Sequence, residues 1–171
     1  MAARIIVVSG APGAGKTTVS GCLARRFERA AHIEADALQR LVVSGSEWPD
    51  TDAVVVGEAA NQLRLRGVHA CLLARSFAAA GFVAVVDDIV VGDRRDEYAE
   101  HLTGSDWCLI LLDPTLEVLR LRNMGRPVNA FGQARALHDV VRATPGVHID
   151  NGALSVAATV ERILEVIARE P

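Results

Sequence analysis

The chain has 171 residues and a formal net charge of −3, and half of its residues are apolar. This composition excludes wholesale disorder and is sufficient for a domain with a sizeable core. The slightly acidic charge gives no basic surface for DNA or RNA, and no segment reaches the roughly 18 apolar residues of a membrane span. We therefore expect one cytoplasmic domain over residues 1–171, without nucleic acid polymers or a membrane as partners; the oligomeric state stays open.

Short apolar runs alternate with longer segments of helical periodicity along the whole chain. The runs predict strands over residues 4–9, 31–33, 82–86, 107–112 and 147–150. The periodic segments predict helices over residues 16–30, 37–43, 93–102, 116–123, 134–142 and 155–169, and a long helix that begins at Thr51 or Asp52 and ends near Ala80, before Gly81. Because strands that are apolar throughout are buried on both faces, the alternation predicts a three-layer α/β/α sandwich around a parallel sheet.

The first predicted strand is followed by GAPGAGKT, which matches G-x-x-x-x-G-K-[ST] and leads directly into a predicted helix. Glycines let successive backbone N–H groups wrap a phosphate, and the positive end of the helix dipole faces the same place. The lysine is expected to reach the β- and γ-phosphates and the threonine hydroxyl to bind Mg²⁺. The residues predicted to bind the nucleotide here are Gly10, Ala11, Pro12, Gly13, Ala14, Gly15, Lys16, Thr17 and Thr18. The sequence implies a nucleoside triphosphate and Mg²⁺ but does not separate ATP from GTP.

Two carboxylates, Asp87 and Asp88, follow the strand predicted over residues 82–86. A nucleotide-bound Mg²⁺ needs a carboxylate at the end of a strand next to the loop, and Asp87 is the first residue after the apolar run. The side chain of Asp88 is expected to point the other way, toward the acceptor or a loop. The alternatives are that Asp88 serves the metal, or that the pair is a solvated strand end.

Asp36 lies just beyond the short strand predicted over residues 31–33, where ligands bind in an open α/β sheet. A carboxylate there can accept the proton of an attacking hydroxyl. Taken alone, the position fits equally well an N-cap of a helix that starts at Ala37.

Three arginines, Arg120, Arg122 and Arg126, follow the fourth strand in LRLRNMGRPVNAFG. Mobile arginines that close over a phosphate stabilise its charge during transfer and exclude water. We expect a lid over about residues 120–133, with Arg122 and Arg126 catalytic and Arg120 structural. The alternative is an ordinary solvated helix face.

The remaining candidates are ambiguous. Asp150 and Asn151, after the fifth strand, fit contact with the nucleotide base and a simple turn equally well. Trp48 fits a stacking surface for a flat substrate or a plug over the sheet. Arg40 is a candidate for an anionic acceptor, and Arg94 or Arg95 is another.

The stretches RIIVVSGAPGAGKTTVSGCLA, ADAL and GFVAVVDDIVVG, in this order and spacing, resemble the chloramphenicol phosphotransferase-like group of small P-loop kinases. That group neighbours shikimate, gluconate and nucleoside monophosphate kinases. The resemblance implies a five-stranded parallel sheet of order 2-3-1-4-5 with a lid. It also implies that Asp36 deprotonates the acceptor hydroxyl and that Arg122 and Arg126 are lid arginines.

Together these features predict an ATP-dependent small-molecule kinase that phosphorylates a hydroxyl group, with antibiotics among the candidate acceptors. The substrate residues are predicted to be Asp36, Arg40, Trp48 and Asp88. One rival is a nucleoside or nucleotide kinase of the same fold, and another is a nucleotide-binding switch protein without transfer activity. An enzyme acting on RNA is a weaker rival because the basic surface is missing.

Overall fold

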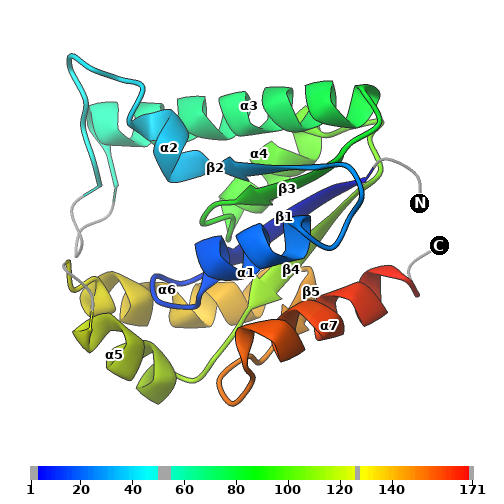
Figure 1. Cartoon of the computed structure of the whole chain (residues 1–171). Helices are drawn as coiled ribbons and strands as arrows, with labels where there is room; N and C mark the ends of the chain where they lie inside the picture. The colour runs from blue at the N-terminus through cyan, green and yellow to red at the C-terminus, as the bar shows by residue number, and fades with distance from the viewer. Residues whose placement is uncertain (1–3, 50–54, 126–127, 170–171) are drawn as a thin grey trace.

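The computed structural model describes residues 4–49, 55–125 and 128–169, and within these ranges one parallel sheet has the strand order β2-β3-β1-β4-β5 (Figure 1). The strands are β1 (Ile5–Gly10), β2 (Ala30–Glu34), β3 (Val83–Asp87), β4 (Trp107–Leu112) and β5 (Val147–Ile149). The helices are α1 (Lys16–Ala24), α2 (Ala35–Gln39), α3 (Gly57–Ala79), α4 (Asp93–His101), α5 (Leu116–Met124), α6 (Phe131–Ala143) and α7 (Val156–Ile167). The predicted fold class and strand order are confirmed.

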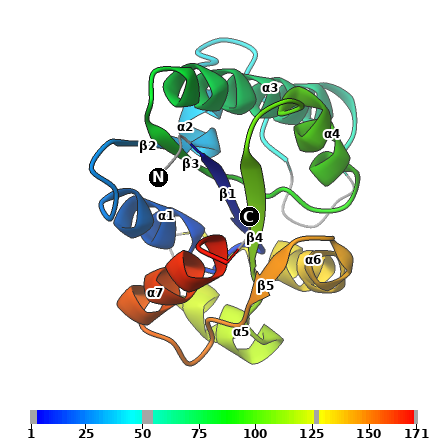
Figure 2. The ribbon, with the colours of Figure 1, turned by 90° about the vertical axis from the view of Figure 1, so that its right-hand side faces the viewer.

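The helices cover both faces of the sheet, as the view turned by 90° shows (Figure 2). α1 and α7 lie on one face, α3 and α4 lie on the opposite face, and α5 and α6 pack together beside β4 and β5. Because all strands run in parallel, their carboxyl ends meet at one edge of the sheet. The residues that follow the strands are therefore brought together there.

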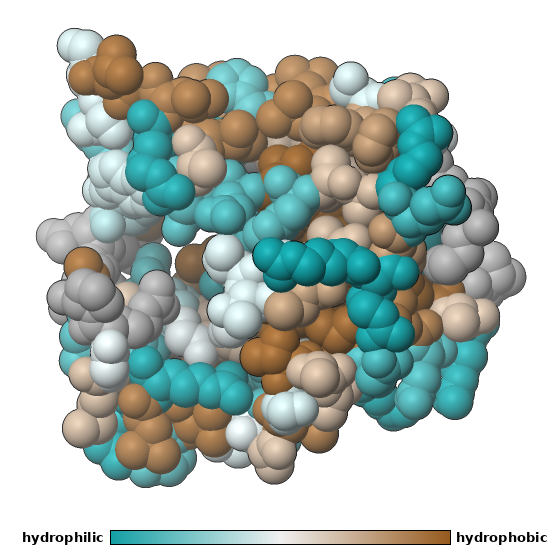
Figure 3. Space-filling view, viewed as in Figure 1, coloured by the Kyte–Doolittle hydropathy of each residue, from teal (hydrophilic) through white to brown (hydrophobic). Residues whose placement is uncertain are grey.

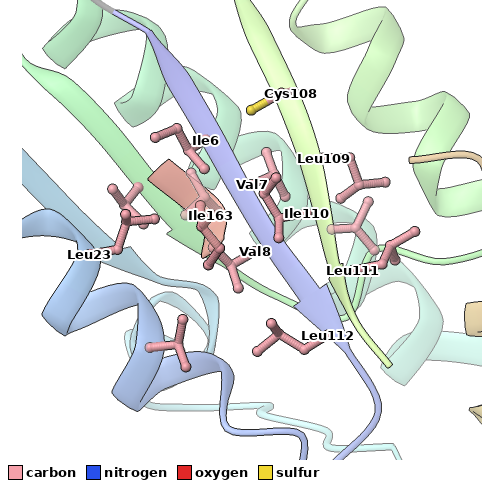
Figure 4. Close-up of a cluster of buried hydrophobic side chains, with 14 of the residues drawn as sticks. Ile6, Val7, Val8, Leu23, Cys108, Leu109, Ile110, Leu111, Leu112 and Ile163 are labelled. Carbon is pink, nitrogen blue, oxygen red and sulfur yellow. The ribbon is translucent and has the colours of Figure 1, made fainter. Parts of the chain in front are cut away.

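The central strands are mostly apolar, as expected for strands whose two faces are both covered by helices. Every residue of β1 and β3 is buried. Figure 4 shows side chains of β1 and β4 packed with Leu23 of α1 and Ile163 of α7. This core holds the ends of β1 and β3 in fixed positions relative to α1.

Several element boundaries differ from the sequence-based prediction. α1 ends at Ala24 instead of continuing to residue 30, because residues 29–30 are already engaged with β3: Val83 N donates to Arg29 O at 2.9 Å and Ala30 pairs with Val83. The predicted start of the long helix at Thr51 or Asp52 lies outside the described residues, and α3 begins at Gly57. It ends at Ala79, before Gly81 with its positive φ of 82°, as predicted.

α2 begins at Ala35, directly after β2, rather than at Ala37. Asp36 therefore lies inside the first turn of the helix, and Glu34 occupies the N-cap position. The interpretation of Asp36 as an N-cap was wrong, and its carboxylate does not cap the helix. The cause is tertiary: β2 continues to Glu34, which pairs with Asp87 of β3, and the chain turns at once into the helix.

No helix in the described ranges is both long and apolar enough to cross a membrane.

Candidate active site

A cavity of about 340 Å³ opens at the carboxyl edge of the sheet. Figure 3 shows the surface hollowed between α2 on one side and α1 and α5 on the other. Its lining residues are Pro12, Gly13, Gly15, Lys16, Thr17, Thr18, Asp36, Asp87, Asp88, Ile89 and Arg122. The structure thus brings the loop of residues 10–17 together with all three candidate carboxylates.

The glycine-rich loop is held open by side chains from elsewhere in the chain. Asn123 of α5 donates to Pro12 O at 3.0 Å, and Asn151, after β5, donates to Ala14 O at 2.9 Å. Gly13 has φ of 89°, and a Cβ there would overlap the Asn123 amide. Because these carbonyls are bound on the outside of the loop, their peptide units are fixed, which favours N–H groups directed into the cavity.

Lys16 and Thr17 open α1 inside the cavity. Lys16 Nζ donates to Gly10 O at 3.0 Å and to Ala11 O at 3.3 Å, so the ammonium lies over the loop. Thr17 Oγ1 donates to Asp87 Oδ1 at 3.1 Å. A cation, an N-terminal helix end and a hydroxyl beside a carboxylate therefore face the same space.

Asp87 and Asp88 point to opposite faces of the sheet, as the alternation along β3 predicts. Asp87 contacts Thr17 of α1, and His32 of β2 lies 2.6 Å from its other oxygen. Asp88 instead reaches α3 and α4 and is bound by Arg66 at 2.6 Å, Arg94 at 2.6 Å and Tyr98 at 2.9 Å. Asp87 is therefore the carboxylate that can serve a metal beside Thr17.

The Asp88 carboxylate is buried but remains charged. Burial acts to raise the pKa of its side chain, but the charges of Arg94 and Arg66 outweigh that effect, so the pKa is lowered from its ordinary value. Burial, together with the neighbouring Asp88 charge, raises the pKa of Tyr98 well above its ordinary value, so the phenol stays a hydrogen-bond donor. Gly67 of α3 makes room for this cluster, since a Cβ there would lie 3.2 Å from the Tyr98 ring.

Asp36 is linked to this buried cluster through Arg66. Arg66 Nη1 donates to Asp36 Oδ1 at 2.9 Å while its Nη2 binds Asp88. The Arg66 side chain is 6% exposed, whereas that of Asp36 is 63% exposed. An exposed carboxylate is thus oriented by a buried, doubly bound guanidinium, an arrangement that suits a base that must reach a substrate.

Other predicted residues have different surroundings. Arg122 lines the cavity, but its Nη groups donate to Ala14 O at 3.2 Å and Asn151 O at 3.0 Å, which ties α5 to the loop and to the segment after β5. Arg120 is exposed and pairs with Glu117 on the same helix. Arg126 lies outside the described residues.

The remaining predicted substrate residues do not line the cavity. Arg40 is exposed, 4.0 Å from Glu34. Trp48 is 47% exposed in the segment after α2, so it is not buried over the sheet as a plug. Of the other two arginine candidates, Arg94 is bound to Asp88 and Arg95 pairs with Asp96 at 3.0 Å.

A second cavity of about 180 Å³ adjoins the first across Arg122. Asn151, Leu154 and Val156 line it, together with Thr18 and Val19 of α1. Asp150 does not; its Oδ1 accepts from Gly152 N at 2.8 Å, which makes a local turn. Of the two residues predicted to contact a nucleotide base, Asn151 therefore lies at the place where a flat, partly apolar group fits.

The donor atoms present fit a magnesium nucleotide. Mg²⁺ prefers hard oxygen ligands, and the Thr17 hydroxyl and Asp87 carboxylate supply them 3.1 Å apart in the cavity that holds Lys16. The backbone at Gly13 and Gly15 has φ of 89° and 97°, conformations that glycine adopts without the strain a side chain would cause. Thr17 and Asp87 would hold the metal, and the loop with Lys16 would hold the phosphates.

Sequence reasoning missed the residues that orient the site: His32, Arg66, Tyr98 and Asn123. One signal in the sequence was His32, a polar residue on the same face of a short strand as Glu34. Another was Gly67 in the middle of a helix, which indicated close packing beside Arg66. No local pattern marked Tyr98 or Asn123.

A five-stranded parallel sheet of this order, with a glycine-rich loop between β1 and α1 and a carboxylate at the end of β3, defines a nucleotide-binding protein of the P-loop kinase fold. Residues 3–167 match the family model described as chloramphenicol phosphotransferase-like protein. The chain belongs to this family, and family and fold together support a phosphotransferase.

Solved structures of the same fold include an APS kinase from Mycobacterium tuberculosis in complex with AMPPNP and APS, with 14% identity, a TM-score of 0.72 and coverage of 98% of each chain. A sugar kinase from a Janibacter species has 18% identity and a TM-score of 0.69, covering 99% of this chain and 96% of its own. A tunicamycin resistance protein from Deinococcus radiodurans has 21% identity and a TM-score of 0.64, covering 96% and 95%. At these identities the likeness concerns the fold. No curated protein matches the sequence.

Proposed function

We propose that the chain is an ATP-dependent kinase that transfers the γ-phosphate to a hydroxyl group of a small, uncharged molecule. The observation that carries the proposal is the position of Asp36. Its exposed carboxylate lies in the same cavity as Lys16, Thr17 and Asp87, on the side away from the second cavity. A phosphate donor and a hydroxyl acceptor can therefore meet between a phosphate-binding loop and a base.

In the proposed reaction the acceptor oxygen bonds to the γ-phosphorus and the bond from that phosphorus to the bridging oxygen breaks, which leaves ADP. Asp36 accepts the proton of the attacking hydroxyl. Lys16 and the loop amides bind the phosphates and stabilise charge on the oxygens during transfer. Thr17 and Asp87 hold Mg²⁺, which neutralises phosphate charge when bound. Arg122, which lines both cavities, contacts the nucleotide in this proposal.

The charge pattern favours an uncharged acceptor. The guanidinium group that contacts Asp36, that of Arg66, is already matched by Asp36 and Asp88, and the guanidinium group of Arg94 is matched by Asp88. An anionic acceptor would meet the exposed Asp36 carboxylate without gaining these cations. The family name and the tunicamycin resistance protein with the same fold support including antibiotics among the acceptors tested.

The test is a panel of hydroxyl compounds assayed for acceptor-stimulated ADP release, with ATP and GTP compared as donors. The panel contains chloramphenicol, tunicamycin, simple sugars, nucleosides and nucleotides. Stimulation by an uncharged hydroxyl compound, with its phosphorylated product detected by mass spectrometry, is the expected result. Stimulation by nucleotides alone would identify a nucleotide kinase instead, and slow hydrolysis that no acceptor changes would identify a switch protein.

A further inference from the structure

A continuous chain of hydrogen bonds links His32 of β2, through Asp87, to Thr17 of α1. His32 Nε2 lies 2.6 Å from Asp87 Oδ2, and Thr17 Oγ1 lies 3.1 Å from Asp87 Oδ1. The side chains of His32 and Asp87 are 20% and 8% exposed. Each oxygen of the carboxylate thus has its own partner.

The sheet register explains why these three side chains meet. In the parallel pairing of β2 and β3, His32 lies opposite Val85 and Glu34 lies opposite Asp87, so His32 and Asp87 project from the same face. α1 packs on that face, and the His32 ring lies beside Gly21, where a Cβ would be 3.6 Å from Nδ1. The ring is therefore confined between the strand and the helix.

The chemistry of the contact sets the direction of the hydrogen bond. An ionised carboxylate only accepts hydrogen bonds, so the ring must carry its proton on Nε2 and donate to Asp87 Oδ2. This bond fixes the rotation of the carboxylate. Oδ1 of Asp87 is then turned toward Thr17 and the phosphate-binding cavity. Asp87 and Thr17 both line this cavity.

We propose that His32 is the positioning residue of the metal site: by holding Oδ2 of Asp87, it presents Oδ1 beside Thr17 in the orientation that a nucleotide-bound Mg²⁺ requires. The inference rests on the proposed function, in which Thr17 and Asp87 hold the metal. Carboxylates at metal sites commonly depend on such partners, and loss of one typically costs about 10-fold to 100-fold in metal affinity or activity.

The experiment compares His32→Leu, which removes the donor, with His32→Gln, whose side-chain amide can donate near the position of Nε2. Mn²⁺ replaces Mg²⁺, and its binding to the protein with AMPPNP is titrated by electron paramagnetic resonance. Binding of AMPPNP without metal and the melting temperature are measured in parallel. His69→Leu on the exposed surface of α3 is the control for loss of a histidine.

The expected result is a drop of about 10-fold or more in Mn²⁺ affinity for His32→Leu, with metal-free AMPPNP binding unchanged. His32→Gln should recover most of the affinity, and His69→Leu should match the wild-type protein. Wild-type affinity in His32→Leu would overturn the positioning role while the proposed function stands. Equal losses in both His32 variants, accompanied by weaker metal-free binding and a lower melting temperature, would show a merely structural role. If the wild-type protein binds AMPPNP but no Mn²⁺, the metal site itself is overturned.

Discussion

Asp87 and Asp88 are consecutive residues whose carboxylates lie on opposite faces of the sheet and have opposite surroundings. Asp87 reaches Thr17 and His32 at the phosphate-binding cavity, and Asp88 reaches Arg66, Arg94 and Tyr98 in the interior. Arg66 connects Asp88 to the cavity, because its second Nη group binds Asp36. In the proposed reaction Asp87 therefore contributes to the metal site, and Asp88 contributes through Arg66 to the position of the base, Asp36.

Asp36→Asn should lower transfer by about 100-fold to 10,000-fold, because the amide cannot accept the hydroxyl proton. Nucleotide affinity and melting temperature should stay near wild-type values, since Asp36 is exposed and the amide oxygen can still accept from Arg66. Initial rates and calorimetric binding of AMPPNP provide the measurements. Glu34→Gln, at the end of β2, two residues before Asp36 and outside the cavity lining, is the matched control. Undiminished turnover in Asp36→Asn would remove this residue from the role of base.

Asp88→Asn should destabilise the fold by about 3 to 5 kcal/mol at pH 7, because the buried guanidinium group of Arg66 and the partly buried one of Arg94 lose their shared counter-charge. Urea unfolding measures this difference. Asp96→Asn, whose carboxylate is exposed and pairs with Arg95, should change stability by less than about 0.5 kcal/mol. An effect of Asp88→Asn as small as the one expected for Asp96→Asn would show that the buried cluster adds nothing measurable to stability.

The Asp88 carboxylate also predicts a pH dependence of stability. Its pKa in the folded protein is lowered from 3.8, so the unfolded chain binds this proton more readily. The stabilisation is fully present above the ordinary pKa and is lost as the pH falls below it toward the folded value. In acid titrations of unfolding free energy below about pH 5, the wild-type curve should therefore fall more steeply than that of Asp88→Asn. Parallel curves would contradict this assignment.

Gly13→Ala should reduce nucleotide affinity by at least about tenfold, or about 1.4 kcal/mol. The new Cβ would overlap the Asn123 amide and displace the loop from its side-chain support. Gly45→Ala is the matched control, since Gly45 also has a positive φ, 71°, but a Cβ there would have nothing within 4 Å. Both variants carry backbone strain, so a loss of binding confined to Gly13→Ala shows that the effect arises in the phosphate-binding loop and not from strain in general.

Arg66→Lys should lower kcat by up to about 100-fold with little change in the KM for ATP. A lysine has one ammonium group and cannot bridge Asp36 and Asp88 in the geometry of the guanidinium fork. Arg64→Lys, on the same helix and paired with Glu97 at the surface, should behave like the wild-type enzyme. If Arg66→Lys keeps its full kcat, Asp36 does not depend on this contact.

The fold was predictable from local patterns because its strands are short, apolar and separated by amphipathic helices. The ends of the elements were less predictable. α1 ends early because Ala30 pairs with Val83 as part of β2, and α2 begins early because it follows β2 directly. These boundaries depend on strand pairing between residues about 50 positions apart, which helical periodicity does not encode.

The sequence by itself determined the phosphate-binding loop, since GAPGAGKT, a preceding apolar strand and a following helix are all local features. It also placed Asp36, Asp87 and Asp88 at the carboxyl edge of the sheet. Only the tertiary structure decided which atoms they meet: His32 is 55 positions from Asp87, and Asn123 is 111 positions from Pro12. Such contacts arise from sheet register and helix packing. Which of the two adjacent aspartates faces Thr17 and which binds the arginines therefore depends on how α1, α3 and α4 pack around β3.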